Sequence, residues 1–200
     1  MQHGAALRRY VQTAWPDFDW EAGYRSFFAE YSQICSVDNL APTRARELAA
    51  RCVIETGTST FYRMVEQARF EPVLTEIARH IANDELRHYK YFYQFFRRYR
   101  DQDRQPRAGI VCTLVSRTAD VKSEDAFIAF KHAFMSRHAS SEFDPHEFAV
   151  YRTFIKRLAQ AHFPHEMAVK MLLKPADLGP MTARFCVPLL TSLCDLYLGW

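Results

Sequence analysis

Two acidic side chains and one histidine are spaced so that they could hold a metal ion together. Glu85 and His88 form a Glu-x-x-His pair, which places a carboxylate and an imidazole side by side on one face of a helix. Alternate steps of four and three residues put this pair on a seam with Leu74, Ala78, Ile81, Phe92, Phe95 and Tyr99. We therefore expect both side chains to face the core, where a carboxylate and an imidazole are costly unless they are paired or bound to a cation.

Glu55 has the matching position on the preceding helical segment. It lies on a seam of small and apolar residues with the same spacing, made of Leu48, Cys52, Glu55, Ser59 and Tyr62. Carboxylate and imidazole ligands without a thiolate suit iron or manganese. The alternative is that Glu85 and His88 satisfy each other or bond to Arg and Tyr side chains, with Glu55 as a surface residue or ion-pair partner.

The elements that position these residues are predicted to be helices. Only 6 of the 200 residues are glycine, 14% are aromatic, and long stretches lack turn residues, which argues against a sheet-rich fold. Helix-start signals and prolines delimit the segments. The segments expected to be helical are 1–12, 18–34, 43–68, 72–103, 126–138, 145 to the proline at 164, and 181–198. The predicted fold class is all-α.

A buried Glu followed about thirty residues later by Asp-Glu-x-Arg-His resembles the ferritin-like di-iron carboxylate proteins. Residues 83–88, NDELRH, are especially similar to the soluble acyl-carrier-protein desaturases. His3 and Gly4 resemble the end of the Glu-x-x-His-Gly motif in the first half of those proteins. The Glu of that motif would fall one position before Met1, so we expect the chain to start inside the second helix of the four-helix site.

The resemblance implies a ferritin-like antiparallel helical bundle, truncated at the N-terminus, over residues 1–103. Residues 104–200 would then form accessory helices packed on the bundle. With the first half of the site outside the chain, we expect weak binding of at most one metal ion. A di-iron centre would belong to the complete protein, and manganese is the alternative metal.

Site residues follow from the same resemblance. Glu55 and Glu85 would be the carboxylate ligands. His88 and His3 would be the imidazole ligands. Thr58 lies where the desaturases place a catalytic hydroxyl near the oxygen-binding face, and Asp84 corresponds to the carboxylate that orients a ligand histidine. Two alternatives stay open: Thr58 could bond back to its own helix, and His3 could lie free in solvent.

The function implied is that of a non-haem di-iron oxidase or oxygenase that uses O₂ for acyl-chain desaturation. Its partners would be a substrate carried on acyl carrier protein, an external electron donor such as a ferredoxin, and a second copy in a homodimer. The alternatives are another di-iron oxygenase, such as an amine N-oxygenase, and a catalytically inactive helical protein. An iron-storage or rubrerythrin role is disfavoured because no Cys-x-x-Cys module is present.

Composition removes other classes of function. The net charge of +3 is too small and dispersed to indicate binding to nucleic acid. No run of 18 apolar residues predicts a transmembrane helix, and the first residues lack the apolar stretch of a signal peptide, so a cytoplasmic protein is expected. The scattered cysteines are interpreted as small core residues: Cys35, Cys52, Cys112, Cys186 and Cys194.

Overall fold

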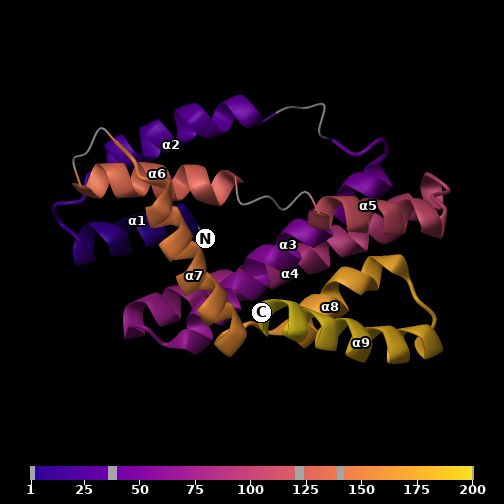
Figure 1. Cartoon of the computed structure of the whole chain (residues 1–200). Coiled ribbons are helices and arrows are strands. Elements are labelled where there is room, and N and C mark those ends of the chain that lie inside the picture. Colours follow the sequence, from indigo (N-terminus) through magenta and orange to yellow (C-terminus); the bar gives the residue numbers. More distant parts are fainter. Residues whose placement is uncertain (1–2, 36–39, 120–123, 139–141, 200) are drawn as a thin grey trace. The chain divides into compact units, whose positions relative to one another are not determined.

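A computed structural model describes residues 3–35, 40–119, 124–138 and 142–199, apart from the side chains of residues 124 and 195–199. Within this part of the chain, the regular elements are nine α-helices and a short 3₁₀ turn, and no strand occurs (Figure 1). The all-α class predicted from the scarcity of glycine is therefore confirmed. The ferritin-like arrangement of the helices stays a prediction.

The chain forms two compact units, each built from two separate stretches of sequence. Residues 1–39 and 122–156 form the first unit, and residues 40–121 and 157–200 form the second. This division differs from the predicted boundary after residue 103, because the helix that follows this boundary packs against the helix that carries Glu55.

The second unit is organised around two long antiparallel helices, α3 (Arg44–Ala68) and α4 (Pro72–Gln102) (Figure 1). At the start of α3, the Thr43 hydroxyl accepts a hydrogen bond from a backbone N–H of the first turn. At the start of α4, the Glu71 carboxylate accepts two such bonds, and proline occupies the first helical position. Both helices therefore begin with a side-chain cap, as the sequence signals predict.

A tight connection brings the middles of α3 and α4 together. Only residues 69–71 join the two helices, and Arg69 has left-handed backbone angles of φ 50° and ψ 41°. Glu55 and Glu85 lie equally far from this connection on the antiparallel pair. At the opposite end, the backbone N–H of Ala45 donates to Oδ2 of Asp103 at 3.1 Å. These two ends fix the register that places Glu55 opposite Glu85.

The core of the second unit lies where α3 and α4 meet α5 (Arg107–Ala119), α8 (His165–Leu173) and the 3₁₀ turn η2 (Lys174–Ala176). Its fully buried members are Ala49, Val53, Phe96, Ile110, Leu114 and Ala176. Small residues on α3 allow the neighbouring helices to approach closely. A second cluster of Cys52, Tyr89 and Met171 continues this core toward the site.

The buried face of α4 departs from the predicted seam. Ile81 is buried as expected, but further along the helix Tyr89 and Phe96 are buried in place of His88 and Phe95. The buried positions Ala82, Tyr89 and Phe96 lie seven residues apart and each follows the predicted seam by one residue, so the buried face is turned by about 100° from the predicted one. The expectation that His88 faces the core is wrong, since 54% of its side chain is exposed.

The end of the seventh helix and the helices that follow it also belong to the second unit. Helix α7 (Pro145–His162) ends just before Pro164, as predicted, and its final turn packs on the end of α3 through Leu158 and Met64. Helix α9 (Pro180–Gly199) packs against α8. It leaves several large apolar side chains exposed: Met181, Phe185, Leu189 and Leu193. No helix in the described ranges is long and apolar enough to cross a membrane.

The first unit contains α1 (His3–Ala14), α2 (Trp20–Ile34), α6 (Glu124–His138) and the beginning of α7. Helix α2 packs along α6 (Figure 1). The Glu30 carboxylate accepts hydrogen bonds from Nζ of Lys131 and from Nε2 of His132. An aromatic cluster joins α6 to α7 through Phe127, Phe130, Phe143, Phe148 and Tyr151.

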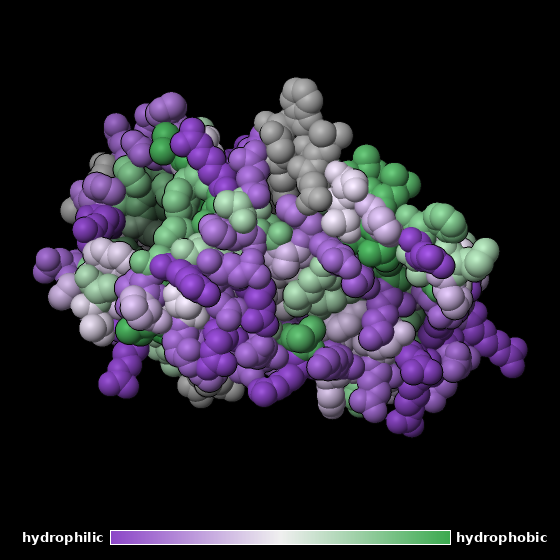
Figure 2. Space-filling view, turned by 90° about the horizontal axis from the view of Figure 1, so that it is seen from below, coloured by the Kyte–Doolittle hydropathy of each residue, from purple (hydrophilic) through white to green (hydrophobic). Residues whose placement is uncertain are grey.

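The cysteines are free thiols rather than a uniform set of core residues. Cys52 is buried as expected, but Cys35 and Cys112 are exposed. Cys35 ends its helix and Cys112 lies on a solvent-facing side of α5, so neither position offers a core to enter. The exposed surface carries hydrophobic residues among the hydrophilic ones, as the face in Figure 2 shows.

Candidate metal centre

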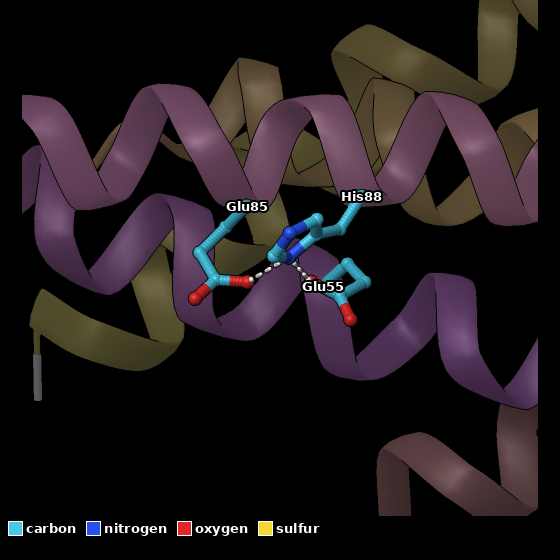
Figure 3. A group of neighbouring side chains, drawn as sticks. All are labelled: Glu55, Glu85 and His88. Carbon is cyan, nitrogen blue, oxygen red and sulfur yellow. Dashed lines mark hydrogen bonds and ion pairs between the residues drawn. The ribbon is translucent and has the colours of Figure 1, made fainter. Parts of the chain in front are cut away.

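Glu55 from α3 and Glu85 and His88 from α4 point toward one another between the two helices (Figure 3). One ligand atom of each lies within 4.8 Å of the other two. Among the residues that the structure describes, these three form the one group of three or more His, Cys, Asp or Glu side chains that lie close enough to share an ion. The structure thus brings together three of the residues that sequence spacing singled out. Their role as ligands stays a prediction.

The His88 imidazole lies on the solvent-exposed side of this group. Nδ1 of His88 lies 3.0 Å from Oε2 of Glu85, a hydrogen bond, and 3.7 Å from Oε2 of Glu55. Only 12% of the Glu55 side chain and 14% of the Glu85 side chain are exposed, against 54% for His88. Two carboxylates therefore form the inner wall, and an ion can enter from solvent on the side of His88.

The Glu55 carboxylate is held in an unfavourable environment. Burial, followed by the hydrogen bond to Glu85 and the negative charge of that residue, raises the pKa of Glu55 to about 8, while Arg51 opposes this shift. Oε2 of Glu55 is buried and has no hydrogen-bond partner. A buried polar atom left without a partner is costly. A cation between Glu55 and Glu85 would offset both the lost solvation and the repulsion.

Two further side chains border the carboxylates. Cys52 lies one turn before Glu55, where burial and then the Glu55 charge raise the pKa of its thiol to about 12, so it is not a thiolate ligand at neutral pH. Tyr62 has a raised pKa because of burial and then the negative charge of Glu85. The desaturase resemblance allows Tyr62, on the predicted seam, either to line a slot for an acyl chain or to form part of an ordinary core. Its position two turns after Glu55, on the same face, was the available signal for its place beside the carboxylates.

Thr58 and Asp84 lie beside the group but bond to their own helices. Oγ1 of Thr58 is 3.2 Å from the carbonyl oxygen of Ile54 and 3.3 Å from that of Glu55, which is the back-bonded alternative. Oδ1 of Asp84 accepts a hydrogen bond from Arg87 at 2.8 Å. The catalytic hydroxyl of Thr58 and the orienting carboxylate of Asp84 both stay predictions.

His3 belongs to a different part of the structure from the grouped side chains. It begins α1 in the first unit, whereas Glu55, Glu85 and His88 belong to the second. Met1 and Gln2, which carry the start of the resemblance to a first-half motif, lie outside the described residues. The assignment of His3 as an imidazole ligand therefore stays a prediction.

Comparison with protein-family models, with curated proteins and with solved structures finds no match to this chain. The chemistry of the site is therefore argued from its own atoms. Two carboxylates and one imidazole are donor types that Fe²⁺ and Mn²⁺ accept, and Oε2 of Glu55 is buried without a hydrogen-bond partner beside the other two side chains. The described residues supply one such set.

Proposed function

We propose that this chain is an iron-binding oxidoreductase of ferritin-like type, in which Glu55, Glu85 and His88 bind one Fe²⁺ ion between α3 and α4. A single observation carries the proposal: three donor atoms from two helices meet within 4.8 Å around a buried Glu55 oxygen that has no hydrogen-bond partner. Manganese is the alternative ion, since it takes the same donors.

The carboxylates and the imidazole would have different roles in such a site. Glu55 and Glu85 would neutralise the charge of a divalent ion, and His88 would bind from the exposed side, where solvent and small molecules have access. Ferrous iron held by these residues would supply redox chemistry with O₂ of the kind that oxidises C–H or N–H bonds. An acyl chain on a carrier protein, and electrons from a ferredoxin, are the substrate and donor that the desaturase resemblance favours. An amine N-oxygenase would use the same three ligands.

A structural role is the second candidate, and one observation favours it. The hydrogen bond of 3.0 Å between His88 and Glu85 satisfies these two groups without any metal. In that case the chain is a helical protein that carries a buried acidic pair and has no redox activity. The two proposals differ in what the three side chains bind, which a titration measures directly.

The test is an anaerobic calorimetric titration of the purified chain with Fe²⁺, repeated with Glu55→Gln, Glu85→Gln and His88→Ala. We expect about one ion per chain, and a loss of affinity of about tenfold or more in each variant, since each removes one of only three protein ligands. The matched control is the double variant Glu76→Gln, His80→Ala, which removes an exposed carboxylate–imidazole pair with a 2.9 Å contact on the same helix. No binding by the wild-type chain, or equal losses in the control, would support the structural role.

A further inference from the structure

A cleft of about 580 Å³ lies on the second unit between α8 with η2 on one side and α9 on the other. Its wall includes Leu173, Leu178, Val187 and Pro188, and Tyr93 of α4 contributes an aromatic ring. Volumes of 300–1,000 Å³ with mostly apolar walls are typical of small-molecule sites. The cleft is separate from the candidate metal centre, because Tyr93 projects from a different face of α4 than His88 does.

The lining of this cleft contains more basic than acidic side chains. Lys170 is paired with Glu166 at 2.6 Å, and Asp177 is paired with Arg100 at 3.1 Å, so both acids of the lining already have a cation. Two further basic residues, Lys174 and Arg184, also line the cleft.

Lys174 and Arg184 are these further cations, and neither forms an ion pair with a described residue. Nζ of Lys174 lies 4.8 Å from the centre of the Tyr93 ring, a cation–π contact that holds the ammonium group at the cleft. Arg184 reaches the same cleft from α9. Two cations from opposite sides, with apolar surface around them, form a site complementary to a single anionic group attached to an apolar body.

We propose that this cleft binds a small organic anion with an apolar body, its acidic group between Lys174 and Arg184 and its body against Val187 and Leu178. An inorganic anion would leave the apolar wall exposed to water, and an uncharged apolar molecule would gain no charge-assisted contact from Lys174 or Arg184. The site is independent of metal binding, so it stands or fails separately from the proposed iron centre.

The experiment uses two fluorescent probes that share their rings and differ in charge: 8-anilinonaphthalene-1-sulfonate, which is anionic, and N-phenyl-1-naphthylamine, which is neutral. The folded wild-type chain is expected to bind one sulfonate probe, about tenfold more tightly than the neutral probe, which is the usual size of one charge-assisted contact. The double variant Lys174→Gln, Arg184→Gln should lose this preference and bind both probes alike. Val187→Asn should weaken the binding of both.

The matched control is Lys90→Gln, Arg98→Gln, which removes one lysine and one arginine from the exposed face of α4. It should keep the wild-type preference for the sulfonate. Both substituted cation pairs are exposed, so circular dichroism and thermal unfolding are expected to match the wild type in each variant. Unchanged sulfonate binding by the cleft variant, an equal loss in the control, or many probes bound per chain would overturn the proposal.

Discussion

His88 on α4 lies close to Glu55 on α3, with 3.7 Å between Nδ1 of the imidazole and Oε2 of the carboxylate. A neighbouring imidazole that carries a proton would favour an ionised carboxylate, yet burial and Glu85 raise the pKa of Glu55 to about 8. Below pH 8 the Glu55 carboxyl therefore holds a proton, and a metal ion that binds to Glu55 must displace this proton. Two predictions about pH follow from this competition.

The first concerns the stability of the metal-free protein. The folded chain keeps the Glu55 proton up to a pKa of about 8, while the unfolded chain releases it near the ordinary value of 4.5. The folded state binds more protons between these values, so the free energy of unfolding falls as pH rises through this window. Glu55→Gln removes this loss and should stabilise the protein at pH 8.5 by roughly 1–2 kcal/mol, a figure reduced for partial solvation.

Urea unfolding at pH 5.5 and 8.5, with a chelator present, measures this effect. Glu66→Gln serves as the control, because Glu66 pairs with the guanidinium of Arg63, which keeps its charge at both pH values. Its effect on stability should be the same at the two pH values. An equal pH dependence in wild type and Glu55→Gln would show that Glu55 has an ordinary pKa.

The second prediction concerns metal affinity. Binding an ion displaces the Glu55 proton, so the affinity for Mn²⁺ should rise about tenfold per pH unit below pH 8 and level off above it. Electron paramagnetic resonance of free Mn²⁺ measures this without oxidation of the metal. Glu55→Gln should bind weakly and with a much shallower pH dependence. A flat affinity in the wild-type chain between pH 6.5 and 8 would rule out displacement of this proton.

The third prediction tests which face of α4 is buried. Phe96 is 1% exposed within the main cluster, whereas Phe95 is only half-buried. Phe96→Ala should therefore lower the free energy of unfolding by about 3–5 kcal/mol, and Phe95→Ala by clearly less. Chemical denaturation of both variants measures the difference. Similar losses would mean that the four-three seam, and not the observed face, describes the packing of this helix.

The fourth prediction concerns the end of α3. Arg69 adopts φ 50°, a left-handed conformation that costs a non-glycine residue about 1–2 kcal/mol. Arg69→Gly should stabilise the second unit by roughly 0.5–1 kcal/mol, since some of the gain is offset by greater freedom in the unfolded chain. Thermal unfolding measures this, with Arg69→Ala as the control that removes the side chain and keeps the strain. A stabilisation by alanine equal to that by glycine would assign the effect to the side chain.

Local signals in the sequence predict most of the helices. The break before Pro72, the end before Pro164 and the capping residues Thr43 and Glu71 are all found where the sequence places them. These features depend on a few adjacent residues and on backbone chemistry that neighbours cannot easily override. The meeting of Glu55 and Glu85 is also predictable, because a short connection between long helices fixes their register.

The exposure of His88 was not predictable from the same spacing. Ile81 and Ala82 are both buried, so the spacing alone does not decide between two seams one residue apart, and only the packing of Tyr89 and Phe96 shows which seam is buried. The division into two units is also hidden, because it depends on which distant helices pair. No local sequence pattern in α2 predicts that it packs against α6.

The pairing of α2 with α6 has a consequence for how the protein is made. Glu30 and Lys131, which join these helices, are 101 residues apart in the chain. During synthesis α2 leaves the ribosome long before α6 exists, so its aromatic face has no native partner while the intervening residues are added. The first unit can be completed only once residue 156 has been translated, and the nascent chain must meanwhile keep that face from aggregation.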